Sequence, residues 1–175
     1  MIVSLEVQPL KKLIFNPEKC TGCRACELAC SFSCEGLFIP SKSRIKVSRI
    51  DEEGIDIPMG CFHCDQAPCM LLCPVRAIYF DKDIGGVLIN HDKCIGCRLC
   101  MTACPFGAIS YDSERRLVYK CDLCGGDPEC VKWCFTQALT YEEAETLAKD
   151  KRAKKVESTV AALTAAARLV VPGRG

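Results

Sequence analysis

Short apolar runs recur along residues 10–141 and predict a series of short strands. Residues 44–50 (RIKVSRI) alternate polar with apolar side chains and predict one further strand, followed by a turn at 51–54. A second recurring phrase contains an alanine followed by isoleucine or leucine, and we interpret it as a short helix that leads into a strand. The repeated unit is therefore strand, loop, short helix, strand, which predicts an α+β fold. The apolar runs are 13–15, 87–89 and 117–119, and the phrases are 74–79, 105–111 and 135–141.

The pattern changes after Tyr141. Residues 142–171 contain no cysteine, glycine or proline and are rich in alanine and charge, which predicts a long helix ended by Pro172 and Gly173. We expect this helix either to fold back on its own domain or to dock against a partner subunit or another copy of the chain. A direct membrane span is not expected, because the apolar part is short and carries charged residues. The apolar stripe of the helix is Val156, Val160, Leu163, Ala167 and Val170.

Cysteine makes up 17 of the 175 residues, which is far more than a packed domain of this length needs. A disulfide framework is not expected, because the count is odd and residues 1–20 contain no signal-peptide pattern. We therefore expect a cytoplasmic protein with reduced thiols. The 23 Lys and Arg nearly cancel the 22 Asp and Glu, and this balance argues against a nucleic-acid partner.

Sixteen of the cysteines form four groups of four, and Cys34 is left over. Groups one and three have gaps of two, two and three residues, the run that bacterial-type ferredoxins use to bind [4Fe–4S] clusters. Structural zinc sites use two close pairs of ligands and often histidine, whereas this chain has only His63 and His91. Iron–sulfur clusters are therefore favoured over zinc. The groups are Cys20, Cys23, Cys26 and Cys30; Cys61, Cys64, Cys69 and Cys73; Cys94, Cys97, Cys100 and Cys104; and Cys121, Cys124, Cys130 and Cys134.

The spacing also predicts how the groups share clusters. Three cysteines on a tight loop reach three corners of one cube, and we expect the fourth to begin a helix and to point toward another cube. Groups two and three would form an inner pair at 57–110, enclosed by groups one and four in an outer pair at 1–56 and 111–141, before a helical extension at 142–175. The predicted ligand sets are set A, Cys20, Cys23, Cys26 and Cys134; set B, Cys121, Cys124, Cys130 and Cys30; set C, Cys61, Cys64, Cys69 and Cys104; and set D, Cys94, Cys97, Cys100 and Cys73.

Residues between the cysteines occupy matching positions in groups one and three. Gly22 matches Gly96, where we expect the backbone to pass close to inorganic sulfide. Arg24 matches Arg98, and a cation there would stabilise a reduced cluster, although a solvated surface charge is an equal alternative. Trp133 precedes Cys134 and either shields a cluster from water or packs in an ordinary core.

Two histidines and the remaining cysteine lie in or near the cysteine groups and are further candidate ligands. His63 lies inside group two and His91 just before group three, but neither is expected to bind iron because each group already has four cysteines. Cys34 is expected either to be a buried spare thiol or to replace the fourth ligand of group one.

The second group reads Cys61-Phe-His-Cys64, Ala67-Pro68-Cys69 and Cys73-Pro74. With the three other groups it resembles the iron–sulfur subunits of the dimethyl-sulfoxide-reductase family over about residues 10–141. The resemblance implies the same nested pairing and a single file of clusters that carries electrons between a catalytic subunit and an acceptor. The chain lacks the long insertions and the membrane anchor of larger members. In this it is similar to small subunits of tungsten aldehyde oxidoreductases or of carbon-monoxide dehydrogenase systems.

The chain shows no dinucleotide-binding glycine motif, no P-loop and no cysteine–histidine pair outside the groups. We therefore expect a non-catalytic electron-transfer subunit with four [4Fe–4S] clusters. Its expected partner is a molybdenum- or tungsten-type catalytic subunit, first a tungsten aldehyde oxidoreductase, with a flavin subunit or a ferredoxin as acceptor. The alternatives are a free polyferredoxin shuttle, a carrier of a carbon-monoxide dehydrogenase or hydrogenase system, and a structural zinc-binding protein.

Overall fold

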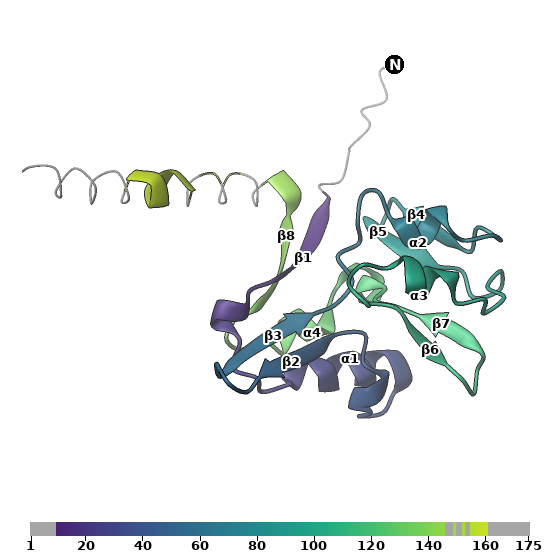
Figure 1. Cartoon of the computed structure of the whole chain (residues 1–175), viewed down its shortest axis with the longest axis horizontal. Coiled ribbons are helices and arrows are strands. Elements are labelled where there is room, and N and C mark those ends of the chain that lie inside the picture. Colours follow the sequence, from purple (N-terminus) through teal and green to yellow (C-terminus); the bar gives the residue numbers. More distant parts are fainter. Residues whose placement is uncertain (1–9, 146–148, 150–151, 153–154, 161–175) are drawn as a thin grey trace, which may run out of the picture.

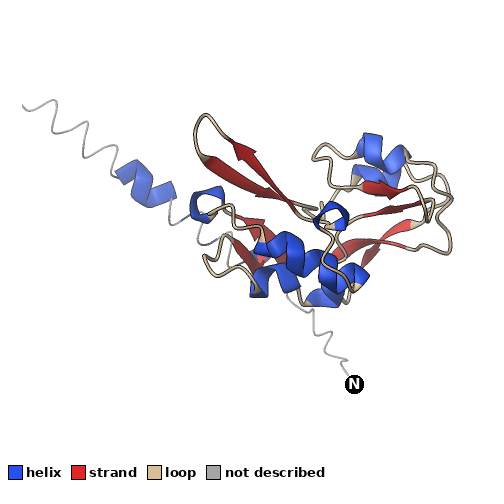
Figure 2. Ribbon diagram, turned by 90° about the horizontal axis from the view of Figure 1, so that it is seen from below, coloured by secondary structure: helices blue, strands red, loops and turns tan. Residues whose placement is uncertain are grey.

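The computed structural model describes residues 10–145, 149, 152 and 155–160. In these residues the strands form separate two-stranded antiparallel ribbons rather than one sheet, and short helices lie among them (Figure 2). The ribbons are β1 (Lys11–Phe15) with β8 (Leu139–Glu143), β2 (Lys46–Ile50) with β3 (Ile55–Met59), β4 (Ile78–Asp81) with β5 (Gly86–Ile89), and β6 (Ser110–Asp112) with β7 (Leu117–Tyr119). The helices are α1 (Ala25–Glu35), α2 (Pro68–Leu71), α3 (Leu99–Ala103) and α4 (Glu129–Lys132), with 3-10 turns η1 (Pro17–Lys19), η2 (Pro40–Lys42) and η3 (Leu123–Gly126).

The predicted strands at 13–15, 44–50, 87–89 and 117–119 are confirmed in β1, β2, β5 and β7. The helices are displaced from their expected positions. Each begins just before the third cysteine of its group, and in groups two, three and four it ends before the fourth. The expectation that the fourth cysteine begins a helix is therefore wrong.

The phrase after each of the last three groups forms a turn rather than the short helix expected there. Its third residue has a positive φ in every copy, 50° at Arg76, 60° at Gly107 and 55° at Gln137. The N–H of that residue donates to the carbonyl of the fourth cysteine, as from Arg76 to Cys73 at 3.2 Å. A left-handed residue cannot continue a right-handed helix, so the chain turns and enters the next strand.

Two separate cores hold the fold together. The first core joins α1 and α4 and is closed by the β1–β8 ribbon, where Leu13 lies opposite Tyr141. The second core joins α2 and α3 with the β4–β5 and β6–β7 ribbons, which lie together on the right of Figure 1. The buried residues of the first are Leu13, Cys26, Cys30, Ile45, Val47, Leu123, Cys130 and Leu139, and those of the second are Ala67, Cys69, Ile78, Val87, Cys100, Ile109 and Val118.

The strand pairs cross the boundaries that the sequence suggested. β3 spans the expected division between residues 56 and 57 and pairs throughout with β2. Val118 and Tyr111 pack in the second core, although the expected outer segment begins at residue 111. Backbone pairing keeps each ribbon in one piece, so β3 stays with β2 and the β6–β7 ribbon stays with the second core.

An ion-pair network joins the two cores. The buried carboxylate of Glu35, at the end of α1, pairs with Arg44 and with Arg115, each at 2.8 Å. Burial alone would raise the pKa of Glu35, but hydrogen bonds from the two arginines outweigh it and hold the pKa below its usual value. The Arg44 guanidinium also lies over the ring of Tyr119 in β7, 4.7 Å from its centroid. α1 is thereby tied to the β6–β7 ribbon.

The expected C-terminal helix starts later than its composition suggested. β8 continues to Glu143, where Glu142 and Glu143 lie opposite Lys12 and Lys11 of β1, and helix begins at Ala144. Cross-strand pairs of opposite charge favour this extension of the ribbon. Residues 155–160 are helical, while the stripe positions 163, 167 and 170 lie outside the described residues. No helix within the described part of the chain is long and apolar enough to span a membrane.

Candidate metal centres

The loops of groups one and three share an unusual backbone conformation. Gly22 and Gly96 both have φ of +67°, and Arg24 and Arg98 follow with φ of 57° and 66°. A Cβ atom on Gly22 would lie 2.4 Å from a carboxylate oxygen of Asp56, and one on Gly96 would lie 2.4 Å from the carbonyl oxygen of Arg116. The positive φ favours glycine at both positions, and at Gly96 the contact with a backbone carbonyl also leaves no room for a Cβ atom, independently of any approach to sulfide.

The cysteines of sets C and D each line one cavity. The cavity of set C lies among Cys61, Cys64 and Cys69 of group two and Cys104 of group three. The cavity of set D is lined by Cys73 of group two and by three cysteines of group three. In each case the fourth thiol comes from the other group, because α2 and α3 pack side by side and each helix ends next to its fourth cysteine.

The cysteines of sets A and B gather around α1 and α4. One cavity is lined by all four thiols of set B, with Cys61 of set C at its edge. Cys26 lies close enough to Cys23 and Cys134 of set A for their thiol charges to interact, and Cys20 packs against the same core. Within the residues described, no three histidine, cysteine or carboxylate side chains converge as a single metal ion requires. In sets B, C and D the four thiols instead line one cavity each.

Neighbouring thiols connect one set to the next. Cys130 of set B interacts with Cys26 of set A, Cys121 of set B with Cys61 of set C, and Cys100 of set D with Cys69 of set C. The sets therefore follow one another in the order A, B, C, D. The two exposed cysteines belong to the sets at the two ends, Cys23 in set A and Cys97 in set D.

The thiols suit a positively charged occupant. Burial raises the pKa of Cys26 and Cys121 to about 12 and that of Cys100 to about 11. Such thiols become thiolates where a bound cation offsets the cost of burying the charge. Cys30 differs, because a hydrogen bond from the Cys34 thiol holds its pKa below the usual value. Cys34 thus supports a ligand of set B, which favours the interpretation of a spare thiol over that of a substitute ligand.

The residues expected beside the clusters have unequal surroundings. Arg98 lines the cavity of set D and lies over the ring of Tyr111, 4.4 Å from its centroid. Arg24 is half exposed and 4.0 Å from Glu27, which fits the alternative of a solvated charge. Trp133 follows α4 with 47% of its surface exposed, so ordinary core packing is wrong for it. Its shielding of a cluster stays a prediction.

The two histidines also differ. His91 is exposed, whereas His63 is 2% exposed and lines the cavity of set C together with the buried Lys120. Burial, and then the charges of Lys120 and Lys12, lower the pKa of His63 to about 3, so the ring is neutral. Sequence reasoning missed Lys120, because it precedes group four in sequence but its side chain reaches the cavity formed by groups two and three.

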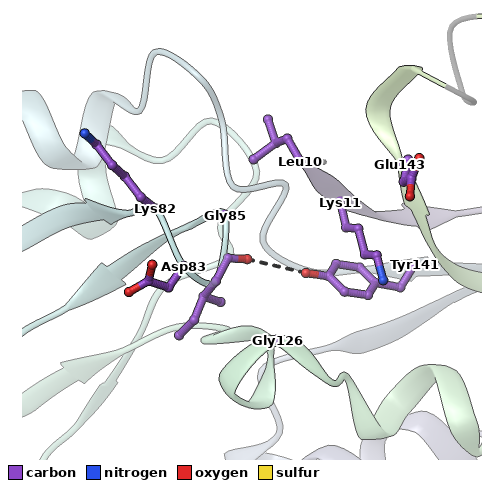
Figure 3. Close-up of a pocket in the computed structure, with 9 residues that line it drawn as sticks. Leu10, Lys11, Lys82, Asp83, Gly85, Gly126, Tyr141 and Glu143 are labelled. Carbon is purple, nitrogen blue, oxygen red and sulfur yellow. Dashed lines mark hydrogen bonds between the residues drawn. The ribbon is translucent and has the colours of Figure 1, made fainter. Parts of the chain in front are cut away.

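A separate polar cavity lies between the β1–β8 ribbon and the β4–β5 turn (Figure 3). The Tyr141 hydroxyl donates to the carbonyl of Ile84 across it, at 3.4 Å. Lys11 and Lys82 are offset there by Asp83 and Glu143, and none of the residues that line this cavity is a cysteine. This cavity lies where the β1–β8 ribbon meets the β4–β5 turn, and it is separate from the thiol sets.

Fold and sites together define a small protein that holds polynuclear metal clusters on cysteine. The chain belongs to the family of 4Fe-4S dicluster domains, because the sequence model of that family matches residues 53–144. The model of a second family, a 4Fe-4S binding domain, matches residues 11–32. It is therefore an iron–sulfur electron-transfer protein that binds [4Fe–4S] clusters.

Named relatives agree with this assignment. The chain is 41% identical to the polyferredoxin-like subunit of an aliphatic sulfonate oxidoreductase from Pyrococcus furiosus, over 75% of this chain and 76% of that one. It is 32% identical to formate hydrogenlyase subunit 2 of Escherichia coli, over 82% and 87% of the two chains. A solved complex of benzoyl coenzyme A reductase, BamBC, contains a chain with 30% identity and a TM-score of 0.46, with coverage of 78% and 77%. The name of the polyferredoxin-like relative agrees with a non-catalytic electron-transfer subunit of an oxidoreductase.

Proposed function

We propose that the chain holds four [4Fe–4S] clusters on sets A to D and relays electrons through them in single file. The observation that carries this proposal is the lining of three cavities, each of which contains all four thiols of one set drawn from two different groups. The same cross-ligation between groups is the rule in two-cluster ferredoxins. When bound, a cluster supplies a site for one-electron transfer, while the protein holds it, excludes water from it and adjusts its potential.

The proposal includes two nested dicluster units. Sets A and B form the outer unit and sets C and D the inner unit, with the boundaries moved so that β3 stays in the outer unit and the β6–β7 ribbon in the inner one. Support comes from the two separate cores and from the packing of α1 with α4 and α2 with α3. The exposure of Cys23 and Cys97 supports sets A and D as the two ends of the proposed relay. Arg24, Arg98 and Trp133 would lie at these ends.

The proposed partner is the catalytic subunit of an oxidoreductase complex. A tungsten aldehyde oxidoreductase is the first candidate, from the resemblance of the sequence to small subunits of such enzymes. The polyferredoxin-like relative adds an oxidoreductase of aliphatic sulfonates to the candidates. A flavin subunit or a ferredoxin would accept the electrons. The formate hydrogenlyase relative favours a second candidate function, that of a carrier in a hydrogenase system.

Paired cysteine variants test the ligand sets. We expect Cys69→Ser and Cys104→Ser to change the same cluster signal, although the two residues belong to different groups. Cys73→Ser should change a different signal, although it lies in the same group as Cys69. The measurement is electron paramagnetic resonance during a potentiometric titration of the anaerobically prepared full chain. If Cys104→Ser instead changes the signal that Cys94→Ser changes, the proposed cross-ligation is wrong.

The partner is tested by purifying the untagged native complex and identifying its other chains. A molybdenum or tungsten subunit that is reduced by its substrate and passes electrons to this chain is the expected result. Recovery of the chain alone, fully loaded and reducible by several unrelated enzymes, would favour a polyferredoxin shuttle.

A further inference from the structure

The position of the His63 side chain is fixed by the backbone and by close packing. The residue has a positive φ of 46° between Cys61 and Cys64, and its side chain lines the cavity of set C. A Cβ atom on Gly86, at the start of β5, would lie 2.9 Å from Nδ1 of this imidazole. The ring is therefore fixed by the packing of β5 against the loop of group two.

The hydrogen bonds of the ring leave one donor unused. The backbone N–H of Val87 donates to Nδ1 of His63 at 3.0 Å, so Nδ1 accepts and the proton of the neutral ring is on Nε2. In the part of the chain that the structure describes, Nε2 of His63 is the single buried side-chain nitrogen or oxygen without a hydrogen-bond partner. A buried donor left without an acceptor destabilises the folded protein, and native proteins rarely contain one.

We propose that the Nε2–H of His63 donates a hydrogen bond to a sulfur atom of the cluster held by set C, and so raises the reduction potential of that cluster. The inference rests on the proposed function, because it needs a sulfur-rich occupant in this cavity. Reduction adds negative charge to the cluster sulfurs, so a donor that faces them stabilises the reduced form more than the oxidised form.

A second group in the same cavity acts in the same direction. The ammonium of Lys120 is buried there and donates to the carbonyls of Val87 and Cys121. Its charge is placed between sets B and C, because Cys121 belongs to the first and the cavity to the second. Among the described residues, the cavity of set D is lined by no histidine or lysine, and its one cation, Arg98, is exposed, so that water screens its charge. Set C should therefore hold the cluster of higher potential within the inner unit.

The test compares three variants of the full chain. We expect His63→Leu to lower one of the four midpoint potentials by at least a tenfold change in the reduction equilibrium, which is about 59 mV for one electron. His63→Gln keeps an N–H donor at a similar reach and should restore most of the potential. His91→Leu changes the other histidine, which is exposed, and should leave all four midpoints unchanged.

A direct readout covers the case in which His63→Leu loses its cluster. The chain contains two histidines, so ¹⁵N-histidine labelling gives an unambiguous source of nitrogen coupling in pulsed electron paramagnetic resonance. The reduced wild-type protein should show a weak ¹⁵N coupling and an exchangeable proton on one cluster, and both should persist in His91→Leu. A wild-type protein with four clusters but without this coupling, or a fully loaded His63→Leu with unchanged potentials, would overturn the inference. A wild-type protein without iron would overturn the proposed function instead.

Discussion

The two cores are built on the same cysteine motif but close in different ways. The first core joins residues from Leu13 to Leu139 and depends on the pairing of β1 with β8, whereas the second lies within Ala67–Val118. Ordering a longer loop costs more entropy, so the first core forms only when both ends of the folded region meet. The spacing of the cysteines thus sets which thiols can gather, while the connection of the strands sets how each core closes around them.

The surroundings of the sets differ as well. The cavity of set C is lined by His63 and Lys120 and none of its four cysteines is exposed, whereas set D has the exposed Cys97. A polar donor or a buried cation stabilises added negative charge, and exposure allows contact with a partner. In the proposed relay, set C would therefore be suited to adjusting a potential and set D to exchanging electrons.

The largest effect is expected from removing β8. A chain that ends at Ala138 deprives β1 of its partner and removes Leu139 and Tyr141 from the first core. We expect sets A and B to be lost and sets C and D to remain, so that iron falls from about 16 to about 8 atoms per chain. A chain that ends at Glu145 keeps β8 and is the control. Equal iron in both truncated chains would contradict the dependence of the first core on this ribbon.

Smaller side chains in each core should act selectively. Leu139 is 2% exposed in the first core and Ile109 is 4% exposed in the second. Replacing either by alanine is expected to cost about 2–5 kcal/mol. Leu139→Ala should hasten the loss of the signals of sets A and B in guanidinium, and Ile109→Ala those of sets C and D. Loss of all four signals together in both variants would mean that the cores unfold as one unit.

The two matching glycines provide a finer comparison. A left-handed conformation costs a residue with a Cβ about 1–2 kcal/mol at either position. In Gly22→Ala the new methyl group meets the side chain of Asp56, which can rotate, whereas in Gly96→Ala it meets the backbone carbonyl of Arg116. Gly96→Ala should therefore lower the denaturant midpoint of bleaching more than Gly22→Ala. The opposite order would show that Asp56 is fixed more firmly than the backbone of the β6–β7 turn.

The smallest effect is expected at the matching arginines. Arg98→Gln removes the contact with Tyr111 and should cost about 0.5–1 kcal/mol. It should also lower the midpoint of the set D cluster slightly, because Arg98 lines that cavity. Arg24→Gln alters a half-exposed side chain and should change both quantities less. Potentiometric titration of the two variants measures the difference. A larger shift in midpoint potential for Arg24→Gln would contradict the claim that Arg98 has the greater effect on its cluster.

The gathering of the cysteines and several strands were predictable because they depend on local spacing, while the role of these cysteines as ligands stays a prediction. The runs at 87–89 and 117–119 are strands, and cysteines of groups one and four do gather in one core. The helix positions were not predictable, because left-handed residues such as Arg76 and Gln137 ended the helical pattern without a glycine to mark them.

Contacts between residues far apart in the chain were not predictable from the sequence, for a different reason. The pairing of Glu35 with Arg115 and the approach of Lys120 to set C join residues far apart in the chain. The close contact between Gly96 and the Arg116 carbonyl likewise exists only after the β6–β7 ribbon has folded. No local pattern of residue types reports such contacts.

Counting metal and sulfide in the anaerobically prepared chain tests the central claim most directly. Four cubane clusters on sixteen thiolates predict about 16 iron and about 16 acid-labile sulfide atoms per chain. Mössbauer spectra should then assign all of the iron to [4Fe–4S] clusters. About half that iron, or zinc without labile sulfide, would contradict a relay of four clusters.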